Sequence, residues 1–325
     1  MKKRNVVLLS ILSIFMLILS ACGQEKNSSK SVDAKESDKA IRIGYQKFGT
    51  LNILKSKGEL ESHLKEVGYT VDWTEFPAGP QLLEALNVGS IDFGHTGEAP
   101  PIFAQAANAP LVYIANQPAN PSGEAIVVQK DSPIKNVKDL KGKKVGLNKG
   151  SNVHYLLVKA LEEAGLTLDD IQPVYLPPAD ARAAFEGNQI DAWVIWDPFL
   201  SAAELELNTK TIQDGEGLVA NREFFLATDS FAENEEALKI IKEELIKVDK
   251  WIEENPTDVA EFLSPEIGMS VEALEKTLKR KEYGLEEISS TVLDDQQKIA
   301  DTFFNLKLIP SKINVLDAST DVKKN

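Results

Sequence analysis

The stretch from Lys143 to Gly165 reads KKVGLNKGSNVHYLLVKALEEAG and combines three local signals. A short strand is predicted over 144–147, and a glycine-containing turn follows it. From Ser151 onward, apolar residues recur at the spacing of a helix that packs on a sheet. Ser151 is a favoured N-cap residue, and Gly165 is typical of a helix C-terminus. Such a turn directs backbone N–H groups at an anion, although an ordinary capped helix has the same sequence features.

The same succession of elements occurs twice in the chain. Ile43-Gly44 recurs as Val145-Gly146, and Ile91-Asp92 recurs as Ile190-Asp191, each at a spacing of roughly 100 residues. Around both sets the pattern alternates strand, helix, strand, helix, strand. Two such units predict an α/β protein with two lobes, each a mostly parallel sheet flanked by helices. The first helix is predicted over 51–67, and the last helices over 235–254, 270–282 and 293–306.

Two segments connect the predicted lobes. The stretch 111–129 contains two strands separated by Pro, Asn, Ser and Gly residues, which suits a first crossing. A strand over 223–228 suits the return, and the helices after it are expected to pack on the first lobe. We therefore expect these boundaries: lobe 1, 40–121 plus 223–325; lobe 2, 122–222; hinges near 117–125 and 220–226.

The first residues form an export signal. Three basic residues precede an apolar run over 6–19, and Leu19-Ser20-Ala21-Cys22 matches the lipobox of bacterial lipoproteins. The apolar run is shorter than the about 20 residues that a spanning helix needs. We expect residues 1–21 to be removed, Cys22 to carry the lipid (palmitate), and 22–39 to be a disordered tether. The protein is then anchored to the extracytoplasmic face of a bacterial membrane, of the Gram-positive type; a plain secretory signal is the alternative.

The formal net charge of −14 disfavours nucleic acid as a partner, because nucleic-acid binding rewards a basic surface. This charge also repels anions at long range, so an anion site has to use oriented hydrogen bonds close to the ligand. Cys22 is the only cysteine, which excludes disulfides and cysteine metal sites. The motifs GxSxG, HExxH and GxxxxGK[ST] are absent from the sequence, so neither an enzyme nor a cofactor is predicted.

Ligands of open α/β sheets bind beyond the carboxyl ends of the strands. Two predicted loops from each lobe lie at such ends and are expected to face each other across a cleft: 45–50, 95–101, 148–152 and 196–199. A rival interpretation is a metal site, since His95 and His154 fall in facing loops with Glu98 and Asp197 nearby. These histidines lack the close spacing of metal ligands, so no metal is predicted.

Four stretches are similar to those of a known family. They are FPAGPQLLEALNVGSIDFGHTGEAPPIFAQA (76–106), KGSNVHYLL (149–157), YLPPADARAAFEGNQIDAWVIWDPF (175–199) and FFLATDSFA (224–232). Here the chain resembles the aliphatic-sulfonate-binding lipoproteins (SsuA type) of ATP-driven ABC importers, within a group that also binds nitrate, taurine and thiamine precursors. The resemblance extends from Ile41 to about Ile313. It implies the two-lobed type II periplasmic-binding-protein fold, in agreement with the repeat.

The resemblance also implies the residues of a ligand-binding site. They are Thr96, Gly97 and Glu98 in lobe 1, Gly150, Ser151 and Asn152 in lobe 2, Gln46 in the first loop and Trp196 at a strand end. Hydroxyl, amide and backbone N–H donors suit the three oxygens of a sulfonate without a formal cation. Trp196, together with Phe48, suits its alkyl chain.

Several of these residues also have a structural interpretation. In this interpretation Thr96 and Ser151 serve only as caps, and Trp196 is part of the core at a strand end. Glu98 and Asp197 do not suit an anion, so each would pair with a ligand amine or hydrogen-bond a neighbouring loop. For Asp197 we favour the structural role, because it precedes a proline and can form a turn.

The resulting hypothesis is a receptor that closes two lobes on an alkanesulfonate. The resemblance implies a membrane permease as the partner of the closed form, with an ATPase on the cytoplasmic side. We expect the receptor to be a monomer. The main alternative is the same role for taurine, nitrate or a thiamine precursor, and a further alternative is an enzyme on the same fold.

Overall fold

The computed structural model describes residues 39–319. The signal peptide predicted over 1–21, the lipid site Cys22 and the tether up to residue 38 lie outside the described residues, as do residues 320–325. These features therefore stay predictions. Within 39–319, no helix combines the length and the apolar character that crossing a membrane requires.

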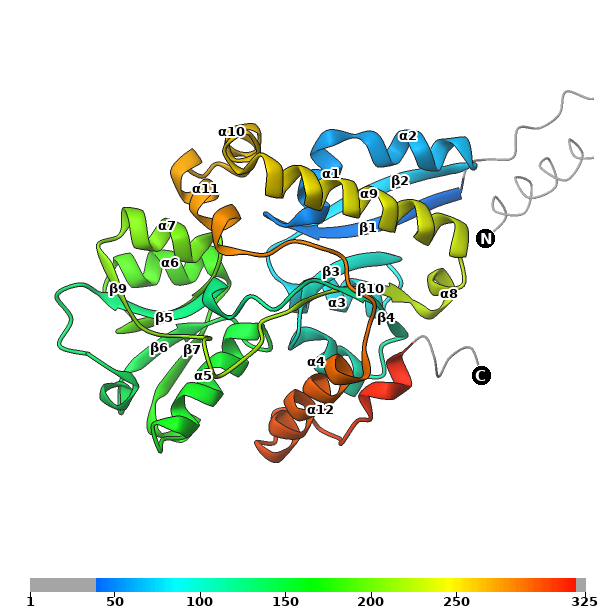
Figure 1. Cartoon of the computed structure of the whole chain (residues 1–325). Helices are drawn as coiled ribbons and strands as arrows, with labels where there is room; N and C mark the ends of the chain where they lie inside the picture. Colours follow the sequence, from blue (N-terminus) through cyan, green and yellow to red (C-terminus); the bar gives the residue numbers. More distant parts are fainter. Residues whose placement is uncertain (1–38, 320–325) are drawn as a thin grey trace, which may run out of the picture. The chain divides into compact units, whose positions relative to one another are not determined.

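Two five-stranded sheets form the framework of the described chain, with the orders β2-β1-β3-β10-β4 and β7-β6-β8-β5-β9 (Figure 1). The antiparallel pairs all involve β10 or β5, and the other strands of each sheet share one direction. The prediction of two mostly parallel sheets is therefore confirmed. The strands are β1 Lys39–Gln46, β2 Tyr69–Phe76, β3 Phe93–Gly97, β4 Leu111–Asn116, β5 Glu124–Gln129, β6 Lys144–Leu147, β7 Gln172–Tyr175, β8 Ala192–Trp196, β9 Thr209–Asp214 and β10 Glu223–Thr228.

Helices cover both faces of each sheet, because successive strand residues point to opposite faces. In the first sheet Phe225 packs in a core with α1, α2, α9, α10 and α11, whereas Phe224 packs in a second core with α3, α4 and α12. In the second sheet α5 covers one face, and α6 and α7 cover the other. The helices are α1 Thr50–Lys57, α2 Glu59–Glu66, α3 Gly79–Asn87, α4 Pro100–Ala106, α5 Asn152–Glu163, α6 Pro178–Glu186, α7 Phe199–Glu206, α8 Asp229–Ala232, α9 Glu235–Glu254, α10 Pro256–Ile267, α11 Val271–Arg280 and α12 Ser290–Asn305.

The single helix predicted over 51–67 is two helices. Gly58, with a φ of 71°, is both the C-cap of α1 and the N-cap of α2. Glycine adopts this left-handed conformation without steric cost, so the chain can change direction there. The apolar pattern continues across the break because Leu54 and Leu60 are fully buried in the same core.

The sequence repeat has a structural basis in both lobes. A Cβ atom on Gly44 would lie 2.6 Å from Cδ1 of Ile91, and one on Gly146 would lie 2.3 Å from Cδ1 of Ile190. The aspartate after each isoleucine accepts a hydrogen bond of 2.8 Å from a backbone N–H of the neighbouring strand, two residues before the glycine. The recurring residues therefore fix how the first and third strands of each unit pack.

Two segments cross between the lobes, 117–123 and 215–222, and hydrogen bonds join them. Asn120 N donates to Ala220 O at 3.0 Å, and Gly215 N donates to Pro121 O at 3.0 Å. The first crossing lies within the hinge predicted near 117–125, whereas the second overlaps the hinge predicted near 220–226 only at 220–222, because β10 begins at Glu223. The exact lobe boundaries, and the hinge motion itself, stay predictions.

Candidate functional site

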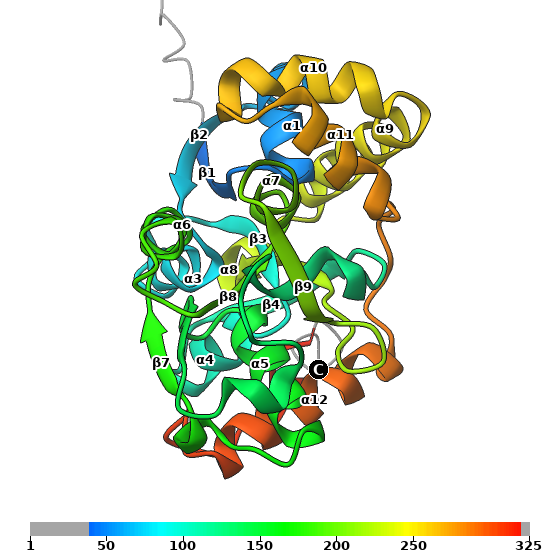
Figure 2. The ribbon, with the colours of Figure 1, turned by 90° about the vertical axis from the view of Figure 1, so that its left-hand side faces the viewer.

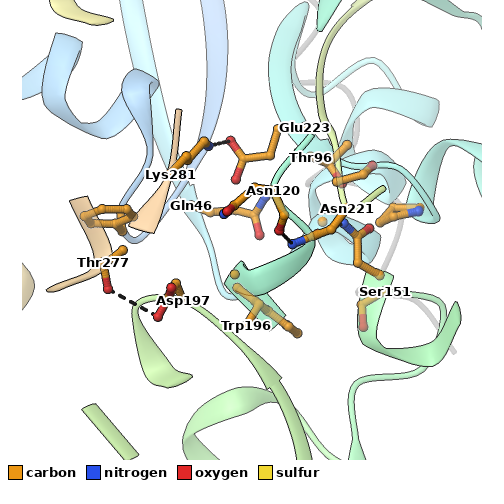
Figure 3. A pocket seen from close by; sticks show the side chains of 16 residues that line it. Gln46, Thr96, Asn120, Ser151, Trp196, Asp197, Asn221, Glu223, Thr277 and Lys281 are labelled. Carbon is orange, nitrogen blue, oxygen red and sulfur yellow. Dashed lines mark hydrogen bonds and ion pairs between the residues drawn. The ribbon is translucent and has the colours of Figure 1, made fainter. Parts of the chain in front are cut away.

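A small pocket lies at the carboxyl ends of β1, β3 and β8, with a volume of about 70 Å³ (Figure 3). It contains residues of all four predicted loops. The predicted site residues that line it are Gln46, Thr96, Gly97, Ser151, Asn152 and Trp196, together with Phe48. The other two predicted residues line neighbouring pockets. Glu98 lines a pocket beside α12, and Gly150 lines a pocket beside α3 and α4.

Helices from both lobes begin at this pocket; α4 does so with Pro100, which has no backbone N–H group. Gly79 is the first residue of α3 and Asn152 the first residue of α5, and both line the pocket. No side chain within residues 39–319 caps the start of α3 or of α5. Ser151 holds the N-cap position of α5, but its hydroxyl donates to Asn148 O at 2.7 Å instead. The first backbone N–H groups and the positive dipole ends of both helices are thus available to an anion. The contribution of α3 is not evident from the sequence.

Thr96 lies at the end of β3 rather than in a loop. Its side chain is fully buried, and its hydroxyl is 3.4 Å from Gly97 O, which is a long hydrogen bond. A Cβ on Gly79 would lie 2.1 Å from the Thr96 hydroxyl oxygen, so this hydroxyl is held against the start of α3. The hydroxyl can therefore donate to the same anion as the α3 amides.

A chain of side-chain amides crosses between the lobes beside the pocket. Ala99 N donates to Asn152 Oδ1 at 3.1 Å, Asn152 Nδ2 donates to Asn221 Oδ1 at 2.6 Å, and Asn221 Nδ2 donates to Asn120 O at 2.8 Å. A Cβ on Gly97 would lie 2.2 Å from the Asn152 amide, so glycine is needed there. Asn120 and Asn221 are lining residues that the sequence does not identify, although both fall in the predicted crossings.

Glu98 supports the crossing rather than the pocket wall. Its side chain is buried, and its two oxygens accept the backbone N–H groups of Asn221 and Arg222, each at 3.1 Å. Burial raises the pKa of Glu98 to about 7, although these two hydrogen bonds oppose the shift. Through Asn221, Glu98 positions a residue that lines the pocket.

Gly150 and the two histidines also have structural contacts. The Nδ1 atom of the fully buried His154 accepts the Gly150 N–H at 3.2 Å and so holds the turn before α5. Burial lowers the pKa of His154 to about 4 and also lowers the pKa of His95, so both are neutral at pH 7. Within the described residues, no three His, Cys, Asp or Glu side chains are grouped as metal ligands.

The opposite end of the pocket contains charged residues that the sequence does not place there. Lys281 Nζ lies 3.0 Å from Glu223 Oε2 and 2.6 Å from Gln117 Oε1. Asp197 also lines this end, where its carboxylate accepts hydrogen bonds from Ser201 and Thr277 and pairs with Arg280. The pocket thus includes a cation, whereas the sequence indicates an anion site built from neutral donors alone. Glu223 and Lys281 are far apart in sequence, and no motif links them.

Two α/β lobes, two crossings and a small pocket between them define a two-lobed solute-binding protein. The chain belongs to the NMT1/THI5-like family, whose model matches residues 63–265.

Solved structures with this fold include two sulfonate-binding proteins. The alkanesulfonate-binding protein SsuA of Xanthomonas axonopodis pv. citri, bound to MOPS, is 39% identical, with 86% of this chain and 97% of that chain covered and a TM-score of 0.82. The periplasmic aliphatic sulphonate binding protein SsuA of Escherichia coli is 43% identical, with 85% and 90% covered and a TM-score of 0.78. The desulfurization enzyme DSZB is 13% identical, with 88% and 98% covered and a TM-score of 0.63. That last likeness shows the fold alone, and the same fold therefore occurs in an enzyme.

Proposed function

We propose that this protein is the receptor of an ABC importer and binds an organic sulfonate between its lobes. The observation that carries the proposal is the convergence of two uncapped helix starts, one from each lobe, on a single pocket. A sulfonate is a monoanion with three acceptor oxygens and no proton to donate. Backbone N–H groups and the Thr96 hydroxyl can donate hydrogen bonds to these oxygens. The sulfonate itself needs no acceptor from the protein. The relatives that bind sulfonates support the same ligand class.

The remaining residues of the proposed site act around that anion. Thr96, Gly97, Ser151 and Asn152 surround the sulfonate, while Trp196 and Gln46 lie beside the rest of the ligand. Glu98 and Gly150 serve as positioning residues, through Asn221 and the α5 turn. Because the ligand joins both lobes, it stabilises the closed state, which the permease then recognises.

The wider setting follows from the export signal and the family. The mature chain would be held by a lipid on Cys22 at the extracytoplasmic face of the membrane and would act as a monomer. It would release its ligand unchanged, without a cofactor and without catalysis. The relatives named as binding proteins support this role over that of the enzyme with the same fold.

Calorimetric titration of the mature chain, unfolded and refolded to remove bound ligand, tests the proposal. We expect heat of binding with ethane- to butanesulfonate and none with sulfate, nitrate or thiamine. Thr96→Val removes one hydrogen bond to a charged group and should weaken binding roughly 10- to 100-fold, with little change in the unliganded melting temperature. Thr302→Val on α12 is the matched control. Binding of nitrate or thiamine in place of every sulfonate would assign the receptor to another ligand.

A further inference from the structure

The pocket has two chemically different ends (Figure 3). Thr96, Ser151 and Asn221 lie at one end and offer uncharged groups. Lys281 and Thr277 lie at the other end, and Glu223 lies between Lys281 and Thr96. If a sulfonate occupies the first end, as the proposed function requires, the remainder of the ligand faces the charged end. The chemistry of that end then decides which sulfonates bind.

Most charged atoms at this end already have partners. One oxygen of Asp197 accepts hydrogen bonds from Ser201 and Thr277, and the other lies 3.1 Å from Arg280 Nη1. The Lys281 ammonium is shared between Glu223 and Gln117, and its side chain is only 8% exposed. Neither Asp197 nor Lys281 is readily available to a ligand.

In the ion pair of Lys281 with Glu223, the glutamate is the residue that a ligand can reach. Its side chain is 31% exposed, and within residues 39–319 the bonds of its carboxylate all use Oε2. Figure 3 shows the second oxygen turned toward the middle of the pocket. Burial opposes the ionisation of Glu223, but the neighbouring Lys281 holds the pKa of this carboxyl below its ordinary value. The carboxylate is therefore charged and faces the ligand at pH 7.

We propose that the pocket selects sulfonates that carry an ammonium group, which binds to Oε1 of Glu223. A plain alkyl tail would cover Oε1 of this carboxylate without replacing the water that hydrates it, and burying a polar atom without a hydrogen-bond partner is unfavourable. An ammonium replaces that water with a charge-assisted hydrogen bond. The resulting zwitterion also has no net charge, so the chain's net charge of −14 does not repel it at long range.

Calorimetry with matched ligands on the mature chain tests this selection. 2-Aminoethanesulfonate is compared with propanesulfonate, and 3-aminopropanesulfonate with butanesulfonate, so that each pair differs only by ammonium in place of methyl. We expect the amino ligand of at least one pair to bind 10-fold or more tightly. The hydroxy analogue of each amino ligand, 2-hydroxyethanesulfonate or 3-hydroxypropanesulfonate, keeps the length and loses the charge, and should lose most of that gain on the unmodified protein.

A variant assigns the effect to its residue. Glu223→Gln should reduce the preference to less than 3-fold, through weaker binding of the amino ligand and not of the alkyl one. Glu287→Gln makes the same charge change at a side chain that is 85% exposed and should leave the preference unchanged. The comparison with the hydroxy analogues holds even if Glu223→Gln fails to fold.

The outcomes separate the two proposals. Equal affinity within each pair, or tighter binding of the alkyl ligand, overturns the ammonium site and leaves the sulfonate receptor intact. A preference that survives in Glu223→Gln overturns the assignment to Glu223. Silence for every sulfonate overturns the proposed function itself, and with it this inference.

Discussion

Close contacts between single residues explain why the repeat is visible in the sequence. Gly44 and Gly146 are needed because an isoleucine just before the third strand of each unit occupies the space of a side chain. The same residue types are therefore required in both units, and the pairs Gly44–Ile91 and Gly146–Ile190 can be recognised from the sequence alone. The pocket residues Asn120, Asn221 and Lys281 give no such signal, because their neighbours come from distant segments and show no periodicity.

The close contact at Gly146 predicts a coupled pair of mutations. Gly146→Ala should lower the free energy of unfolding by about 1–3 kcal/mol, because the new methyl group overlaps Cδ1 of Ile190. Ile190→Val removes that atom, so the double variant should regain most of the loss. Urea denaturation of the four proteins measures this coupling. Additive effects of the two changes would show that the two side chains do not compete for space.

The buried Glu98 predicts a pH dependence of stability. Its pKa of about 7 in the folded protein lies above the value of 4.5 expected in the unfolded chain. Below pH 4.5 both states are protonated; between pH 4.5 and 7 the unfolded state loses the proton and the folded state keeps it. The free energy of unfolding should fall by about 3 kcal/mol over this interval as the pH rises.

Glu98→Gln isolates this effect from other buried acids. Asp249, whose pKa burial raises to about 6, contributes with the same sign, so the informative quantity is the difference between wild type and variant. Denaturation at several pH values should give a shallower decline for Glu98→Gln between pH 4.5 and 7. Parallel curves would contradict the assignment of this proton to Glu98.

At the scale of elements, most of the first sheet and its helices follow from hydrophobic periodicity. The helix predicted over 51–67 is interrupted because Gly58 turns the chain without disturbing the apolar pattern. The elements α7, α8, α10 and β9 are not predicted, since their sequences are short or partly exposed and lack a clear pattern. The start of α3 carries Pro80 in its first turn but no side-chain cap, so the helix can be predicted, whereas its place at the pocket is a result of tertiary structure.

The contact between α7 and α11 joins the lobes at a third place (Figure 2). Arg280 on α11 pairs with Asp197 and Glu204, and Lys276 lies 2.8 Å from Glu204. Glu204→Gln removes the carboxylate that both cations share, and should weaken sulfonate binding about 2- to 5-fold because the closed state loses a partly exposed ion pair.

Calorimetry measures the affinity, and small-angle scattering of the unliganded variant reports whether the lobes move apart. Glu275→Gln is the control. It makes the same change in charge, but Glu275 pairs with Lys279 on its own helix, α11. If both variants bind sulfonate equally well, the contact between α7 and α11 does not contribute to closure.

At the scale of the whole described chain, the fold explains why the site residues are dispersed in the sequence. Each crossing leads into the one strand that is antiparallel to the other strands of its sheet. This strand is β5 in one sheet and β10 in the other. The strand ends of both lobes therefore face the crossings, and the pocket combines Thr96 and Trp196 with Asn120 and Asn221. The predicted loops locate this region, whereas the residues of the crossings become part of it only in the folded chain.

The central claim is that the starts of α3 and α5 hold the sulfonate together. The most direct test is a ¹H–¹⁵N NMR titration of the mature, isotope-labelled protein with a binding sulfonate, following the amides of Gly79 and Asn152. The account predicts that both signals shift downfield and saturate together at the calorimetric stoichiometry. A sulfonate that binds with measurable heat and leaves both amides unchanged would contradict it.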